Sequence, residues 1–229
     1  MKTISEANCG LGLYDEGIQQ IGEASEIFKR LGDTTEQAEC LIGLTRLLYE
    51  DDQLDAAEEA ASCAINLLPE KGQEFQVCNS HRLLGNVYHS KGEREKAIYH
   101  FEAALGIASS FDWHGHLFWI HYSLAKLFFD EDRFDDAHAR IEQAKSHAVN
   151  DKYKLGRAMD LQANFWYKQD RFEEAKSEAL CAAEIFERLG AASDLERCRK
   201  LLQWIQEELD LPDISTVRSS TRCCLLHIS

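Results

Sequence analysis

Five stretches of the chain share one helical pattern of small and apolar positions at a nearly constant spacing. They begin at residues 17, 57, 97, 137 and 175, so successive starts lie 40, 40, 40 and 38 residues apart. Each begins with a small residue, has an apolar residue four positions later and has alanine three positions after that. These spacings place the three positions on one face of an α-helix, where small residues allow a second helix to approach closely. The five alanines are Ala24, Ala64, Ala104, Ala144 and Ala182.

A second helical pattern precedes each of the last four stretches. It has a bulky residue, a small residue and, three positions on, a bulky or aromatic residue, as in Leu84, Gly85 and Tyr88. A short polar turn such as residues 130–133 joins the two helices, and its acidic residues suit the positive N-terminal end of the next helix. Gly32 and Gly190 are predicted to end helices in the left-handed conformation. The chain is therefore predicted to consist of repeated helical hairpins.

The third repeat closely resembles the tetratricopeptide repeat (TPR). The resemblance is carried by Leu84, Gly85, Tyr88, Gly92, Ala97, Phe101 and Ala104. The usual period of that family is about 34 residues, so this chain would have longer helices. Thr45, Gln162 and Gly17 depart from the family pattern. The resemblance implies an all-α fold, a right-handed superhelical α-solenoid of TPR hairpins.

The resemblance covers roughly residues 1–209 and divides them into an incomplete first repeat, four full repeats and a C-terminal capping helix at about 192–209. The first repeat has only a short polar segment in place of its first helix. The last helix has a charged outer face, as the end of a solenoid requires. Residues 210–229 lose the periodicity and are predicted to be a disordered tail. Lipid modification of Cys223 or Cys224 stays open.

Charge and the absence of apolar runs exclude several classes of partner. The chain has 25 Lys and Arg against 40 Asp and Glu, a net charge of −15, which disfavours nucleic acids and anionic membranes. Neither a signal peptide nor an apolar run of about 20 residues is present, so a cytoplasmic protein is predicted. The eight cysteines form no CxxC pair, which favours ordinary thiols over a zinc site.

Sequence motifs for catalysis are absent. The chain has no Walker A sequence, no GxSxG and no HExxH, so no catalytic residue, cofactor or metal is predicted. The weakest alternative is an enzyme with a ligand pocket built from His114, His116 and Asp160. A calcium loop at residues 130–132 is not expected, because the glycine and terminal Glu of such a loop are missing.

The resemblance implies that the first helix of each pair lines a concave groove. The outward positions of each first helix can be counted from its small residue. They carry basic, amide and aromatic side chains, which can hydrogen-bond a peptide backbone, pair with its carboxylates and pack its side chains. The predicted groove residues are Arg46, Tyr49, Arg82, Asn86, His89, Trp119, Tyr122, Lys126, Arg157, Asn164 and Tyr167. TPR domains that clamp the C-terminal carboxylate of chaperones have residues like Arg82, Asn86 and Arg157 at these positions. They also have an asparagine where Ser123 stands and a basic residue where Leu161 stands, so such a clamp is not expected here.

Two hypotheses for the function follow. The first is a noncatalytic scaffold that binds a protein or peptide partner in the groove. The second is a regulatory fragment of a larger signal-transduction NTPase, because residues 184–190 and 194–202 resemble the TPR tails of fungal NACHT or NB-ARC proteins. Partner identity and oligomeric state stay open.

Overall fold

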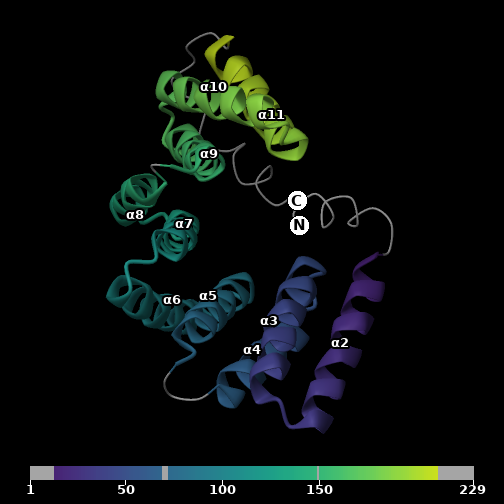
Figure 1. Cartoon of the computed structure of the whole chain (residues 1–229). Coiled ribbons are helices and arrows are strands. Elements are labelled where there is room, and N and C mark those ends of the chain that lie inside the picture. Colours follow the sequence, from purple (N-terminus) through teal and green to yellow (C-terminus); the bar gives the residue numbers. More distant parts are fainter. Residues whose placement is uncertain (1–12, 69–71, 149, 211–229) are drawn as a thin grey trace. The chain divides into compact units, whose positions relative to one another are not determined.

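The computed structural model describes residues 13–68, 72–148 and 150–210. Within these ranges the regular secondary structure consists of ten α-helices and no strand (Figure 1). The predicted all-α fold is therefore confirmed, whereas the N-terminal segment, Pro69 and the predicted tail lie outside the described residues. The helices are α2 (Leu13–Leu31), α3 (Thr34–Glu50), α4 (Leu54–Leu67), α5 (Glu74–Ser90), α6 (Arg94–Ser110), α7 (His114–Asp130), α8 (Phe134–His147), α9 (Lys152–Lys168), α10 (Phe172–Leu189) and α11 (Ala192–Asp210).

The chain forms two compact units, one ending at Ala158 and the other beginning at Met159. In the first unit the helix pairs α3–α4, α5–α6 and α7–α8 are hairpins, and α2 packs beside α3 (Figure 1). The first helix α5 also contacts the first helices on either side of it, α3 and α7. Among the described residues no comparable contact joins α4 to α6 or α6 to α8. The first helices of this unit therefore line its inner side and the second helices lie outside them.

The alanine face predicted from the repeat is the core of each hairpin. In the first unit Ala57, Ala97 and Ala137 are fully buried, as are the alanines seven positions after them. Ala175 is buried in the same way in the second unit. The first stretch is less enclosed, and Gly17 is only half-buried, because α2 packs chiefly against α3.

The turns between helices follow the same period. Each turn within a hairpin has one residue of positive φ, and glycine occupies only one of these four positions. The four residues are Asp52 (φ 59°), Gly92 (φ 75°), Asp132 (φ 57°) and Asp170 (φ 63°). The left-handed conformation predicted for Gly32 and Gly190 is confirmed, with φ of 74° and 68°. Aspartate tolerates this conformation better than most residues because its short side chain can hydrogen-bond locally.

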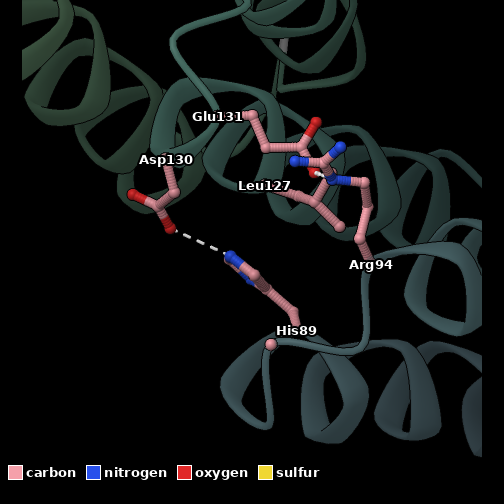
Figure 2. Close-up of a pocket in the computed structure, with 6 residues that line it drawn as sticks. His89, Arg94, Leu127, Asp130 and Glu131 are labelled. Atoms are coloured by element: carbon pink, nitrogen blue, oxygen red, sulfur yellow. Dashed lines mark hydrogen bonds and ion pairs between the residues drawn. The ribbon is translucent and has the colours of Figure 1, made fainter.

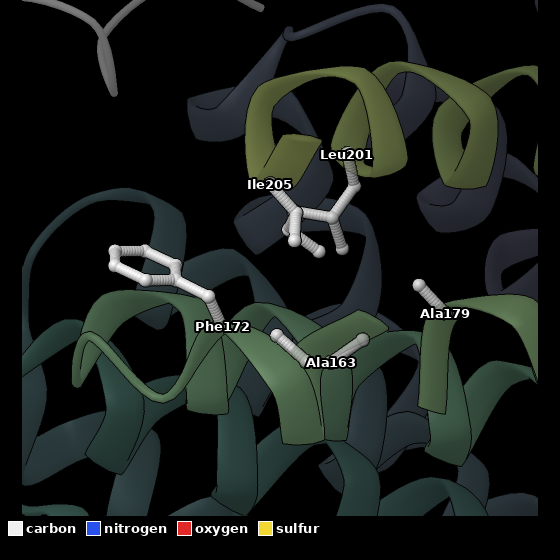
Figure 3. Packing of buried hydrophobic residues seen from close by; sticks show 6 residues of the cluster. Ala163, Phe172, Ala179, Leu201 and Ile205 are labelled. Carbon is white, nitrogen blue, oxygen red and sulfur yellow. The ribbon is translucent and has the colours of Figure 1, made fainter. Parts of the chain in front are cut away.

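The second unit is held together by an apolar cluster. Phe172 and Ala179 of α10 face Leu201 and Ile205 of α11, and Ala163 of α9 lies beside them (Figure 3). Next to this cluster, Arg197 donates to Asp194 at 2.5 Å and to Asp160 at 3.4 Å, and both carboxylates are buried. The helix α11 thus covers the apolar face of α10 and occupies the range predicted for the capping helix.

Candidate partner-binding surface

Nine of the predicted groove residues belong to the first unit, and we refer to them as the inner face. They are Arg46 and Tyr49 on α3, Arg82, Asn86 and His89 on α5, Trp119, Tyr122 and Lys126 on α7, and Arg157 on α9. Their spacing of three or four residues within a helix keeps them on one side of it. Contacts among α3, α5 and α7 bring these three stripes next to one another.

Arg46 and Arg82 form a positively charged pair that no carboxylate of the described part of the chain neutralises. Arg46 is exposed, and Arg82 is half-buried and donates from Nη2 to Oδ1 of Asn79 at 2.8 Å. Within the described residues, no Asp or Glu lies at ion-pair distance from either guanidinium. Burial and the like charge of Arg46 lower the pKa of Arg82 to about 10, so Arg82 stays positive at neutral pH. An anion is the partner that this pair lacks.

Two further polar side chains of the inner face, Lys126 and Asn86, have no ion-pair or hydrogen-bond partner among the described residues. The Lys126 ammonium is exposed and forms no ion pair with any described residue. The half-buried amide of Asn86 has no hydrogen-bond partner in the same part of the chain. An amide side chain provides both donors and an acceptor, which suits a peptide backbone. Asn86 on α5 and Lys126 on α7 therefore extend the surface that can bind a peptide or its carboxylates beyond Arg46 and Arg82.

Tyr122 and Arg157 are engaged with each other. Arg157 donates from Nη2 to the Tyr122 hydroxyl at 2.9 Å, and its guanidinium lies 5.2 Å from the centre of the same ring. Trp119 packs edge-on against that ring at 5.7 Å. Only 7% of Tyr122 is exposed, so its part in the surface is to hold Arg157 rather than to offer a free ring. Tyr49 accepts a hydrogen bond from Ser90 at 3.2 Å and is half-buried.

His89 lines an open pocket of about 290 Å³ between the α5–α6 turn and the C-terminal end of α7. Its Nε2 lies 2.9 Å from Oδ2 of Asp130, and Arg94 pairs with Glu131 on the opposite wall (Figure 2). A carboxylate beside an imidazole can orient a general base. None of the six lining residues is Ser, Thr or Cys, so the pocket offers that base no side-chain nucleophile to activate.

The other two predicted residues belong to the second unit. Asn164 donates from Nδ2 to the main-chain oxygen of Asp160 at 2.7 Å, one helical turn earlier. Tyr167 packs edge-on against Phe172 at 5.7 Å, and both side chains contribute to the apolar cluster of that unit. Asn164 is thus used within α9, whereas Tyr167 helps to pack α9 against α10.

An aromatic cluster at the beginning of α5 and α7 was missed by the sequence analysis. Phe75 packs edge-on against Trp113 at 5.4 Å and against His116 at 4.6 Å, and Phe111 stacks on Trp113 at 4.8 Å. A usable signal existed, because Phe75 precedes Arg82 by seven residues and so lies on the same stripe of α5.

The histidines considered for a ligand pocket are used differently. His116 belongs to the aromatic cluster, whereas the Nδ1 atom of His114 lies 3.0 Å from that of His147. Asp160 is buried beside Arg197 in the second unit. No grouping of three or more His, Cys, Asp or Glu side chains that could hold a metal ion exists among the residues that the structure describes.

Comparisons with known proteins identify the fold. Neither a protein-family model nor a curated protein matches the chain. Among solved structures, the TPR protein TTC0263 of Thermus thermophilus has a TM-score of 0.63 at 18% identity, over 91% of this chain and 97% of that one. BtubC (BKLC) from P. vanneervenii has a TM-score of 0.64 at 16% identity, over 86% and 91% of the two chains. The fold is therefore a TPR-type helical repeat.

Two further structures are named for their partner or activity. A Rap protein complexed with Competence and Sporulation Factor has a TM-score of 0.63 at 13% identity, over 90% of this chain. Aspartyl phosphate phosphatase F from Bacillus subtilis has a TM-score of 0.61 at 13% identity, over 91% of this chain. This chain spans 62% of the Rap protein and 58% of the phosphatase, and at these identities the likeness concerns the fold alone. No described helix is long and apolar enough to cross a membrane.

Proposed function

We propose that this protein is a noncatalytic scaffold that binds a protein or peptide partner on the inner face of its first unit. The observation that carries this proposal is a set of three cations on adjacent first helices, Arg46, Arg82 and Lys126, that have no carboxylate partner among the described residues. The chain has a net charge of −15, and many of its other basic side chains are paired, so an unneutralised basic stripe stands out. Acidic segments of a partner would supply the missing charge.

The chemistry of the inner face suits a peptide. Guanidinium groups bind carboxylates through two parallel hydrogen bonds, and an amide such as Asn86 can pair with a peptide group. The Rap protein of similar fold was solved with a factor bound, which supports a binding role for this type of fold. The noncatalytic part of the proposal rests on the missing motifs and on the His89 pocket, which lacks a side-chain nucleophile. We place the protein in the cytoplasm.

Capture of partners with matched variants tests the proposal. The variant Arg46→Gln/Arg82→Gln/Lys126→Gln removes three charges from the inner face, and Lys29→Gln/Arg30→Gln/Lys200→Gln removes three from exposed sites elsewhere. Proteins recovered from an extract of the source cells by the wild type are identified by mass spectrometry and retested in purified form. We expect the first variant to lose them and the control to keep them, with unchanged helical circular dichroism. Equal recovery by both variants contradicts the proposal.

The alternative function is regulation within a larger signal-transduction NTPase. It depends on the sequence likeness of residues 184–190 and 194–202 to TPR tails of that class. Mapping the transcript upstream of the first codon tests it, and an in-frame stop codon there would contradict it.

A further inference from the structure

The aromatic cluster, defined as Phe75, Phe111, Trp113 and His116, is both fixed and exposed. Trp113 caps α7, and its main-chain N–H donates to the oxygen of Ala108 at 3.0 Å. Stacking of Phe111 on this indole, with 14° between the ring planes, fixes both rings. Phe75 and Phe111 are nevertheless each 49% exposed. Aromatic rings that are held in place but left open to water are typical of a surface that another molecule covers.

The same cluster is continuous with the cations of the inner face. Phe75 and Arg82 are seven residues apart on α5, which is two helical turns, so their Cα atoms lie about 10 Å apart along one stripe. His116 links the two parts, because its ring contacts Phe75 and the pKa of that ring is lowered by burial and by the charges of Arg82 and Lys154. An apolar surface and an unneutralised guanidinium therefore adjoin one another.

We propose that the aromatic cluster and the Arg46–Arg82 pair form one recognition subsite, for an extended segment of a partner protein that carries an apolar side chain about three residues from a carboxylate. This inference rests on the proposed function and specifies the ligand of the same surface. The spacing follows because an extended chain in the polyproline II conformation rises about 3.1 Å per residue and turns once every three residues, so side chains three residues apart lie on one side of it. They are about 9 Å apart, which fits the roughly 10 Å between Phe75 and Arg82. The apolar side chain covers the Phe75 and Trp113 rings, and the carboxylate pairs with the guanidinium groups.

A single-stranded nucleic acid is the competing ligand for aromatic rings beside arginines, since bases stack on such rings. Its phosphates would meet a protein with a net charge of −15, which opposes binding over the rest of the surface. A segment with one or two carboxylates needs only the local positive charge of Arg46 and Arg82. The electrostatics of the chain therefore favour the protein segment.

Three labelled nonapeptides with blocked ends test the ligand. The first carries one leucine and, three residues later, two glutamates in a glycine and serine background. The second replaces the leucine with serine, and the third replaces the glutamates with glutamines. We expect the first to bind at least about tenfold more tightly than either of the others in fluorescence anisotropy, because burial of a leucine and pairing of a carboxylate each contribute about that much. Equal affinities for the first and second peptides overturn the aromatic part of the subsite.

Variants assign the two contacts to residues. Phe75→Ser should lower the affinity for the first peptide to that for the serine peptide, and Arg82→Gln to that for the glutamine peptide. Tyr99→Ser on α6 is the matched control, because this ring is 65% exposed and lies outside the cluster, and it should change nothing. Binding should also alter tryptophan fluorescence in the wild type, and the change should be smaller in Trp113→Phe, which keeps Trp119 of the inner face. A Phe75→Ser variant that binds the first peptide like the wild type overturns the inference.

The remaining outcomes separate this inference from the proposed function. If none of the peptides binds while partner capture still requires Arg82, the scaffold stands and the ligand assigned here is wrong. If none of the peptides binds and partner capture does not require Arg82 either, both proposals fail. If a ten-nucleotide oligo(dT) binds in a Phe75-dependent manner more tightly than the first peptide, the subsite belongs to nucleic acid and the inference is overturned.

Discussion

Replacing Gly85 by alanine should destabilise the protein, although alanine is the better helix former. A Cβ atom added to Gly85 would lie 2.5 Å from two ring carbons of Phe101 and 2.9 Å from a third. Carbon atoms in proteins prefer separations of about 3.5–4.0 Å, so the ring would have to move by about 1 Å. Phe101 is fully buried among the residues of α5 and α6 and has little room to do so.

The magnitude follows from two opposing effects. Overpacking a core costs about 1–3 kcal/mol, whereas replacing glycine by alanine within a helix contributes about 0.5–1 kcal/mol. Because the overlap is with two carbons of a fully buried ring, the cost lies in the upper part of its range, and we expect Gly85→Ala to lose about 1–2 kcal/mol of unfolding free energy. Gly106→Ala is the matched control, because Gly106 lies within α6 and has no atom within 4 Å of an added Cβ. It should gain about 0.5–1 kcal/mol.

Urea unfolding followed by circular dichroism at 222 nm would measure both variants. Helical repeats need not unfold in one step, so the midpoints are compared at unchanged slope. The midpoint should fall for Gly85→Ala and rise for Gly106→Ala. Adding Phe101→Leu to Gly85→Ala should cost less than the sum of the single changes, since the smaller side chain leaves room for the methyl group. Equal stability of Gly85→Ala and the wild type, with Gly106→Ala stabilised, would refute the packing argument.

Three further predictions concern the turns, the buried histidines and the second unit. Asp52 has a φ of 59°, so Asp52→Val should lower the thermal midpoint while Asp52→Gly should not, as differential scanning calorimetry can show. Burial, followed by the charges of Arg140 and His147, lowers the pKa of His121 to about 4. As the pH falls, the unfolded chain therefore takes up a proton at this residue before the folded chain does. The folded state loses stability between about pH 6.5 and pH 4, and it keeps that stability above pH 6.5. The stability difference between pH 7.5 and 5.0 in urea titrations should shrink by about 1 kcal/mol or more in His121→Gln, and an unchanged difference would contradict this. Arg197→Ala removes a guanidinium that pairs with two buried carboxylates, Asp194 and Asp160, and should cost about 2–3 kcal/mol by urea unfolding, against less than about 1 kcal/mol for the exposed Arg188→Ala.

The helices and their core could be predicted because both depend on local spacing. A small residue such as Ala97 or Ala137 recurs at a constant interval, and any helix that buries one such position buries the positions four and seven residues later as well. The turns were predicted less completely. Asp132 and Asp170 adopt the same left-handed conformation as Gly92. A glycine in the sequence indicates this conformation, whereas an aspartate does not.

The accessibility of the candidate surface could not be read from the sequence. Helical phase places Tyr122 on the inner face, but Arg157, 35 residues later, donates to its hydroxyl and covers its ring. The partner of a polar side chain depends on which hairpins are neighbours and on the rotamers they adopt, and neither is encoded in the spacing within one helix. The lack of a carboxylate beside Arg82 in the described ranges could not be predicted for the same reason, since it depends on all the elements around that residue.

The two faces of α5 connect stability with binding. Gly85 is buried against Phe101 of α6, and Arg82, less than one turn earlier, belongs to the inner face beside Arg46 of α3. The close approach at Gly85 therefore sets how near α5 lies to α6, and α5 in turn packs on α3, which carries Arg46. The like charges of Arg46 and Arg82 repel each other, and in the free protein the packing of the helices opposes that repulsion. An anionic segment that binds between them removes the repulsion, so ligand binding and hairpin packing should stabilise the same arrangement.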